Sequence, residues 1–334
     1  MAVILVLVSH WLPKSFFLNK IPLGNIGVDI FFVISGFLIT GILLRDYEDI
    51  SQGRSSFLIK LKTFFLKRTL RISPIYYILL FFLYLTNGNE FKDNIIYYLS
   101  YTSNYLFYLT QDWHGYTAHF WSLAVEEQFY LFWPILLLLF LKKYHLSIIL
   151  SLIVCGIMYS IYNVDNMSRI LTVSCFHALG LGALLAFLEI YKIKWRVKLY
   201  SFINYIFYPL LLLLLLNYTF LNLIYFPLRL VTAILTIKIL LICINNKEDN
   251  LIFKFLNFRL LNYLGVISYG LYLYHNIVPK YFNRFLRTLE IEIFKEEFSN
   301  IYVFSIVNLI MLVFLSTLSW FLFEKPILKL KKYL

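Results

Sequence analysis

The chain has 334 residues, of which 61% are hydrophobic and only 14% are charged. Soluble proteins contain about 45 to 50% apolar and about 25% charged residues, so the composition excludes a water-soluble globule and predicts a polytopic membrane protein. The net charge of +12 would suggest nucleic-acid binding in a soluble protein. Here the basic residues separate apolar segments, as loop charges do in membrane proteins, so nucleic acid is not an expected partner.

Apolar runs bounded by charge, Pro, Gly or Asn predict an all-α fold of about ten membrane spans, each close to the roughly 20 residues that a bilayer requires. In chain order the predicted spans are residues 1–12, 26–44, 72–86, 121–141, 147–162, 169–188, 203–221, 223–244, 259–280 and 301–323. The aromatic segment 93–110 is expected at the membrane interface. We treat residues 1–334 as a single transmembrane domain.

The first predicted span is short. Twelve residues of helix reach only about 18 Å, whereas the hydrocarbon core is about 30 Å thick. A signal peptide is the alternative interpretation, but neither a basic amino-terminal segment nor a small-residue cleavage site after Trp11 accompanies it. We therefore expect a first helix that is shortened at its amino terminus.

The distribution of basic residues predicts the orientation. If the amino terminus is cytoplasmic, the inside loops hold 20 Lys and Arg residues and the outside loops hold 8. This split follows the positive-inside rule. It predicts that both termini are cytoplasmic and that the protein is a multi-pass membrane protein.

Few titratable groups fall inside the predicted spans, and such groups are functional candidates by default. They are Asp29, Glu126, Glu127, His10 and His275. The predicted directions of the spans bring them to a similar depth, where imidazoles and carboxylates together could transfer protons at neutral pH. The histidines could equally serve as helix–helix hydrogen-bond partners, and Glu127 could face an aqueous vestibule.

A basic segment, Lys67-Arg68-Thr69-Leu70-Arg71, lies at the cytoplasmic edge of the predicted span 72–86. Arg68 and Arg71 are three residues apart and share a helix face, so both guanidiniums could bind one phosphate or carboxylate. The alternative is a lipid anchor, because basic residues that flank spans contact anionic headgroups. The three cysteines lie in apolar stretches without a Cys-x-x-Cys pair, so no metal site is predicted.

Several motifs together resemble a known family. The two long ones are Gly27-Val28-Asp29-Ile30-Phe31-Phe32-Val33-Ile34-Ser35-Gly36-Phe37-Leu38-Ile39 and His119-Phe120-Trp121-Ser122-Leu123-Ala124-Val125-Glu126-Glu127-Gln128-Phe129-Tyr130-Leu131. The shorter ones are His10 ending the first span, Arg68-x-x-Arg71, Gly180-x-Gly182-Ala183-Leu184-Leu185-Ala186, Ile267-Ser268-Tyr269-Gly270-Leu271-Tyr272-Leu273-Tyr274-His275 and Glu324-Lys325-Pro326. In this order they resemble the acyltransferase-3 family of bacterial membrane-bound O-acyltransferases.

The resemblance implies a ten-helix membrane enzyme that takes an acyl group, often acetyl, from cytoplasmic acyl-CoA. The acceptor would be a hydroxyl of a surface or exported carbohydrate, such as a lipopolysaccharide, capsule or exopolysaccharide sugar. It also implies His10 as the catalytic histidine, and Arg68 with Arg71 as the donor-binding residues. The family pattern has a further arginine, which in this chain would precede Met1.

The mechanism that we expect is direct transfer, with His10 as general base for the acceptor hydroxyl. Asp29 or Glu126 would orient the imidazole and stabilise its cation, and an acyl-enzyme intermediate is the alternative. We assign Glu127, Tyr272 and His275 to substrate binding. No permanently bound cofactor is expected, and acyl-CoA is a substrate.

Two other classes of function are compatible with part of this pattern. A proton-coupled transporter or flippase would also use acids and histidines inside the membrane. However, no pair of Gly- or Pro-broken spans stands at corresponding positions in two halves of the chain. A structural scaffold is the other alternative, and it predicts that replacing His10 changes only stability.

Overall fold

The computed structural model describes residues 1–13, 15–163, 165, 167–221, 223, 226–245, 251–288 and 301–333. Three of the counted loop charges (Lys14, Lys247 and Lys295) and residues 224–225 of one predicted span lie outside the described residues. All regular secondary structure within these ranges is helical. The predicted all-α class is confirmed.

Eight helical segments in the described ranges are long and apolar enough to cross a membrane, which confirms a polytopic membrane protein. They are built on α2 (Leu23–Ser51), α3 (Phe57–Thr86), α7 (Phe120–Leu139), α8 (Lys142–Tyr162), α9 (Thr172–Tyr191), α10 (Ile193–Leu216), α11 (Leu228–Asn245) and α17 (Ile301–Ser319). The first predicted span corresponds to the shorter helix α1 (Ala2–Trp11).

Shorter helices connect or extend these spans. They are α4 (Asn89–Asp93), α5 (Ile95–Leu99), α6 (Ser103–Thr110), α12 (Leu251–Leu256) and α18 (Lys325–Lys329). Short 3-10 turns cover Phe17–Lys20, Gly115–Thr117, Ser168–Ile170 and Leu330–Tyr333, and π turns cover Asn217–Leu221 and Trp320–Glu324. The segment 93–110, which we expected at the membrane interface, folds as short helices.

The predicted span 259–280 is wrong as a single helix. The structure divides it into α13 (Arg259–Val266), α14 (Ser268–Tyr274) and α15 (Ile277–Thr288). The backbone leaves regular helix at His275 and Asn276, although neither Pro nor Gly stands there. The break places His275 at a helix junction, where its ring packs among the ends of other helices.

The predicted start of the third span, at residue 72, is also wrong. Helix α3 begins at Phe57, because the Ser56 side chain accepts a hydrogen bond from the backbone N–H of Ile59 at 3.3 Å and caps the helix. Arg68 and Arg71 therefore lie inside a continuous helix and not at its edge.

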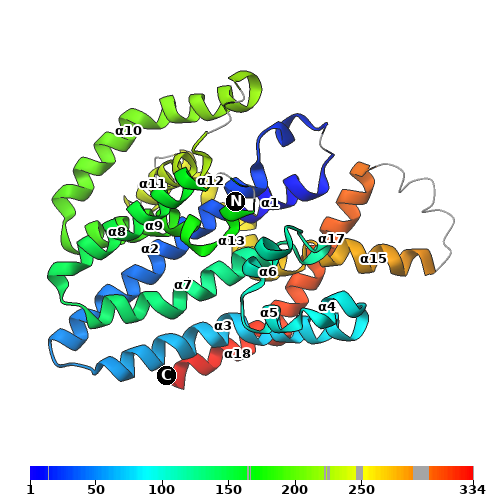
Figure 1. Ribbon diagram of the computed structural model, residues 1–334, viewed down its shortest axis with the longest axis horizontal. Helices are drawn as coiled ribbons and strands as arrows, with labels where there is room; N and C mark the ends of the chain where they lie inside the picture. The colour runs from blue at the N-terminus through cyan, green and yellow to red at the C-terminus, as the bar shows by residue number, and fades with distance from the viewer. Residues whose placement is uncertain are drawn as a thin grey trace.

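Helix α2 lies at the centre of the bundle and packs against α1, α9, α11, α7 and α3 (Figure 1). Its tightest contact is with α9, where glycines face each other's helix. A Cβ at Gly36 would collide with the carbonyl oxygen of Leu179, and one at Gly182 with the carbonyl oxygen of Val33. Small residues allow this close approach of membrane helices, so both glycines are required by packing.

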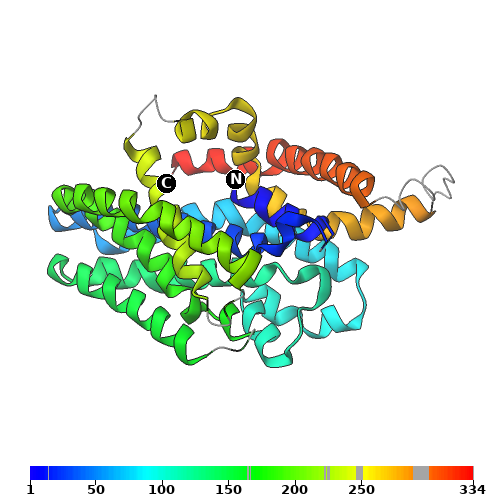
Figure 2. The same cartoon turned by 90° about the horizontal axis from the view of Figure 1, so that it is seen from above.

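Ion pairs gather where α2 ends and its neighbours begin. Lys60 Nζ lies 2.7 Å from both Asp46 and Asp49, and Lys142 Nζ lies 2.7 Å from Glu48. Helix α10 lies on the periphery of the bundle (Figures 1 and 2) and leaves many of its apolar side chains exposed. These features are those of a helix bundle with charged ends and lipid-facing flanks.

Candidate functional site

A cavity of about 490 Å³ opens between α2, α3, α7 and α14. Its walls combine apolar side chains of α2 with a set of polar groups from all four helices. The polar lining residues are Ser35, Arg68, Arg71, Ser122, Glu126, Tyr130, Ser268, Tyr269 and Tyr272. Three residues assigned from the sequence to different roles (Arg68, Glu126 and Tyr272) therefore border one space.

Two arginines supply the positive charge of this cavity. Arg68 and Arg71 lie one turn apart on α3 and both line it, and the Arg68 guanidinium stacks over the Tyr130 ring at 5.4 Å. Within the described part of the chain, neither guanidinium has a carboxylate within 4.0 Å. Their charge is thus available to an anionic ligand, which planar guanidiniums bind bidentately.

Glu126 is held in the cavity wall by a short hydrogen-bonded chain. Ser35 Oγ and the Tyr130 hydroxyl lie 2.6 Å apart, and that hydroxyl donates to Glu126 Oε2 at 3.4 Å. Glu127 follows at the next helical position and does not line the cavity. Its Oε1 is buried and has no hydrogen-bond partner among the described residues.

Three histidines form a cluster beside the cavity. The His275 ring centroid lies 5.1 Å from that of His10 and 4.7 Å from that of His119, both edge to face. Tyr272 connects the cluster to the cavity, because it lines the cavity and its ring centroid lies 5.4 Å from that of His275. The Trp11 indole N–H, beside His10, donates to the His275 carbonyl oxygen at 3.1 Å.

His119 was not among the predicted site residues, because it stands just before the apolar run 121–141 and outside every predicted span. Its presence in the second long motif was the signal that could have identified it. The hydrogen bonds show its state. Nε2–H donates to the Leu273 carbonyl oxygen at 3.0 Å, and Nδ1 accepts from the Asn276 amide at 3.3 Å, so both ring nitrogens are occupied.

His275 differs from His119 in having a free nitrogen. It is fully buried, with 0% of its surface exposed, and its Nδ1–H donates to the Tyr272 carbonyl oxygen at 2.7 Å. Nε2 has no hydrogen-bond partner among the described residues. Since Nδ1 carries the proton, the free Nε2 is an acceptor.

Asp29 does not have the environment that the sequence suggested. We expected it beside His10, but its Oδ1 accepts from Arg229 Nε of α11 at 2.6 Å. The other guanidinium nitrogens of Arg229 donate to the carbonyl oxygens of Ser174 and Arg169. This ion pair and the accompanying hydrogen bonds hold α2 against α11 and the start of α9.

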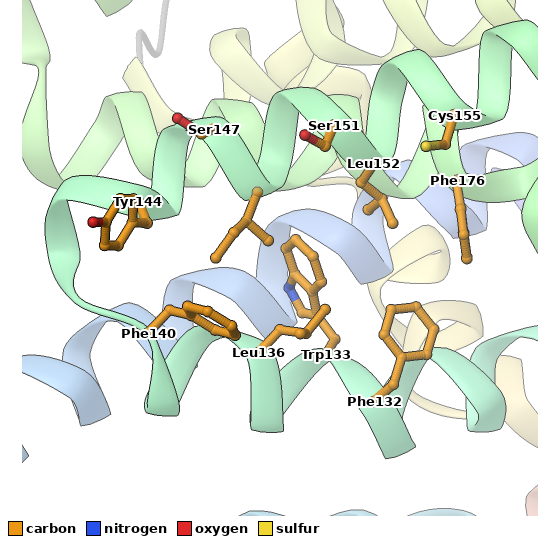
Figure 3. Close-up of a pocket in the computed structure, with 11 residues that line it drawn as sticks. Phe132, Trp133, Leu136, Phe140, Tyr144, Ser147, Ser151, Leu152, Cys155 and Phe176 are labelled. Atoms are coloured by element: carbon orange, nitrogen blue, oxygen red, sulfur yellow. The ribbon is translucent and has the colours of Figure 1, made fainter.

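A second and larger hollow of about 590 Å³ lies between α7 and α8. Figure 3 shows its aromatic and aliphatic walls, including Trp133, Leu136 and Phe176, with the hydroxyls of Ser147 and Ser151 on α8. None of its lining residues is charged or is a histidine. Its polar groups are neutral ones, from Tyr144, Ser147, Ser151 and Cys155, and none carries the charge that binds an anion, so the polar cavity beside the histidines is the candidate site.

One group of side chains in the described ranges has the composition of a metal site. The ligand atoms of Glu90, Asp112 and His114 lie within 4.8 Å of one another. However, both ring nitrogens of His114 already have partners: Glu90 Oε1 at 3.1 Å and Thr110 Oγ1 at 3.0 Å. These contacts account for the cluster without an ion.

An arginine-lined cavity joined through Tyr272 to a cluster of two buried histidines, His119 and His275, and the exposed His10 has the groups needed to bind an anionic donor and to move a proton. This defines the class as a membrane group-transfer enzyme. The sequence profile of the acyltransferase-3 family, an acyltransferase domain, matches residues 1–325. The chain therefore belongs to this family, which confirms the resemblance of its motifs and the predicted enzyme class.

Relatives agree with this family. A Staphylococcus aureus (strain COL) protein named "Putative O-acetyltransferase" is 38% identical over 189 residues, which cover 49% of this chain and 30% of the relative. Peptidoglycan O-acetyltransferase OatA of Listeria monocytogenes is 38% identical over 133 residues, covering 36% of this chain and 20% of that protein. The chain thus spans only a minor part of the length of these relatives. No solved structure matches it.

Proposed function

We propose that this chain is a membrane O-acyltransferase that moves an acyl group, most simply acetyl, from acyl-CoA to a hydroxyl of a cell-surface or exported carbohydrate. The observation that carries the proposal is the cavity bordered by Arg68, Arg71 and Glu126, which Tyr272 and then His275 connect to His10. Family membership and the names of the relatives support acyl transfer. A carbohydrate acceptor agrees with the peptidoglycan named for one relative.

The donor would bind at the arginine end of the cavity. Its phosphates would contact Arg68 and Arg71, whose charges have no carboxylate partner within 4.0 Å in the described residues. The pantetheine arm would then follow the apolar wall of α2, which includes Phe31 and Ile39, toward Tyr272. This course brings the thioester from the phosphate site to the histidine cluster.

The reaction proposed at the cluster is direct transfer. His10 takes the proton of the acceptor hydroxyl while the oxygen attacks the thioester carbonyl carbon. The C–O bond forms, the C–S bond breaks, and the leaving CoA thiolate receives the proton from the His10 imidazolium. Glu126 is half-buried in the cavity wall and contacts Tyr130, so its stabilisation of the positive charge that develops at His10 would act across the cavity and not through a direct contact.

The proposed location is a bacterial inner membrane with both termini in the cytoplasm. In this orientation α2 runs inward, so Arg68 and Arg71 face the cytoplasmic acyl-CoA while His10 lies nearer the outer surface. The basic-residue asymmetry of the loops supports this arrangement.

The test uses sealed membrane vesicles from cells that express the chain. [14C]Acetyl-CoA, which does not cross membranes, is added to inside-out or right-side-out vesicles, and label is counted as acetate released by mild alkali from the glycan fraction. We expect transfer in inside-out vesicles and none in right-side-out vesicles or in vesicles lacking the chain. Proton-coupled solute uptake without any acetyl transfer would instead establish the transporter alternative.

A further inference from the structure

The buried nitrogen of His275 points to a role that differs from the substrate contact expected from the sequence. We propose that His275 is the positioning residue for His10: its Nε2 accepts the ring N–H of His10 and leaves the other His10 nitrogen free to act as base. The inference rests on the proposed function. It adds a neutral histidine, which orients the base His10, to the groups that take part in proton transfer.

The hydrogen-bonding state of His275 is fixed. Its Nδ1–H is held by the Tyr272 carbonyl oxygen at 2.7 Å, so the neutral ring presents a lone pair at Nε2. That nitrogen is buried without a partner in the described residues. A buried polar atom left unpaired costs free energy, so a partner is expected in the working state.

His10 is the neighbour best suited to become the partner of His275 Nε2. In the part of the chain that the structure describes, three titratable rings pack against His275: His10 from α1, His119 from the start of α7, and Tyr272 from α14. His119 has used both ring nitrogens, on Leu273 and Asn276. The Tyr272 hydroxyl is bonded to Ser122. His10 has a donor to offer, and its ring centroid lies 5.1 Å away, edge to face.

Contacts at the end of α1 hold the His10 and His275 rings together. The Trp11 indole N–H donates to the His275 carbonyl oxygen at 3.1 Å, and the Ser305 hydroxyl of α17 donates to the Trp11 carbonyl oxygen at 3.0 Å. The end of α1 is therefore fastened to the junction of α14 and α15. The break in the predicted span 259–280 is what brings His275 to this place.

The chemical consequence concerns both steps of proton transfer. In neutral His10 a single N–H, donated to His275, selects the tautomer in which the remaining nitrogen can accept the hydroxyl proton. Once His10 is an imidazolium, the same hydrogen bond becomes charge-assisted and stabilises the cation. His275 keeps its own proton on Tyr272 throughout, so it never carries charge itself.

Two amide substitutions test the roles of the two ring nitrogens of His275 separately. In His275→Asn the amide can replace the Nδ1–H donor to Tyr272 but leaves nothing at the Nε2 position. In His275→Gln the longer side chain can place its amide oxygen near the Nε2 position and so restore the acceptor. The proposal therefore requires the Gln variant to be more active than the Asn variant. A purely structural role of His275 does not require this difference.

The chain offers a matched control in His145 of α8. It is also fully buried, its Nε2–H donates to the Phe140 carbonyl oxygen at 3.0 Å, and its Nδ1 has no partner among the described residues. It packs against Tyr47 and not against the histidine cluster. His145→Asn therefore removes an equally buried, half-paired ring without touching His10.

The experiment measures initial rates of alkali-labile [14C]acetyl transfer in inside-out vesicles at several acetyl-CoA concentrations. Each rate is divided by the amount of folded protein, which is determined by fluorescence-detected gel filtration. For His275→Asn we expect kcat to fall about 10-fold to 100-fold, the range of one charge-assisted hydrogen bond, with KM unchanged. His275→Gln should recover most of kcat, and His145→Asn should match the wild type.

Equal kcat for the Asn and Gln variants, or a change in KM alone, would overturn the proposal. If the Asn variant does not fold, a folded His275→Gln protein with kcat lowered as far as that of His10→Ala would overturn it as well. The proposed function fails separately, when wild-type vesicles transfer no label. Wild-type transfer combined with equal Asn and Gln variants rejects only the role of His275.

Discussion

Asp29 and His275 are both buried polar side chains in an apolar bundle, with 2% and 0% of their surfaces exposed, but their surroundings differ. Asp29 pairs with an arginine whose remaining nitrogens also have acceptors. His275 keeps one nitrogen without a partner beside a second histidine. Buried polar groups are normally paired, so the pairing of Asp29 with Arg229 indicates a structural contact. The unpaired nitrogen of His275, unlike that of His145, lies beside a second histidine that can donate to it.

The largest effect is expected at His10. Replacing it by Ala removes the proposed base and should lower acetyl transfer about 100-fold to 10,000-fold, while the amount of folded protein in the membrane stays near that of the wild type. The measurement is alkali-labile [14C]acetate per folded protein. Normal transfer by a well-expressed His10→Ala protein would remove the histidine cluster from the mechanism.

Asp29 should show a loss of stability. In Asp29→Leu the Arg229 guanidinium, which is half-buried, is left without its counter-charge, and removal of one partner of a buried pair costs up to about 3 to 5 kcal/mol. Thermal unfolding of the purified protein in detergent should shift strongly downward. The double variant Asp29→Leu/Arg229→Met is the control and should recover part of the shift, because no charge remains unpaired. An unchanged melting temperature in the single variant would contradict the structural assignment of this pair.

The arginines test whether the cavity binds the donor. Lys keeps the charge of Arg68 and Arg71 but loses the planar fork, so the double Lys variant should bind CoA about 10-fold to 100-fold more weakly if charge-assisted contacts are lost. Titration calorimetry with CoA measures this. Lys67→Arg, on the same helix but outside the cavity lining, should leave affinity unchanged. Wild-type affinity in the double variant would favour the lipid-anchor interpretation.

The smallest effect concerns the glycine contact between α2 and α9. Gly36→Ala should destabilise the protein by about 1 to 3 kcal/mol, as overpacking does, because the added methyl meets the Leu179 carbonyl oxygen. Gly41→Ala in the same helix is the matched control, since nothing lies within 4 Å of a Cβ built there. Thermal unfolding compares the two. Equal stabilities would show that α2 and α9 are not as close as described.

The helical class, most spans and the family could be predicted from the sequence, because apolar periodicity and contiguous motifs are local signals. Contacts between distant segments could not. Asp29 and Arg229 are 200 residues apart, and His119 enters the histidine cluster only because the loop before α7 packs against the α14–α15 junction. The start of α3 was missed because its first turns are basic, and hydropathy does not register a helix that Ser56 caps.

The most direct test of the contrast between the histidine cluster and the Asp29–Arg229 pair uses His10→Ala and Asp29→Asn vesicles prepared and assayed side by side. The quantity compared is acetyl transfer per amount of folded protein. We expect His10→Ala to be folded and inactive, and Asp29→Asn to be less abundant but active per folded molecule. A stable Asp29→Asn protein without transfer, together with an active His10→Ala protein, would contradict this assignment and place the chemistry at the Asp29–Arg229 pair.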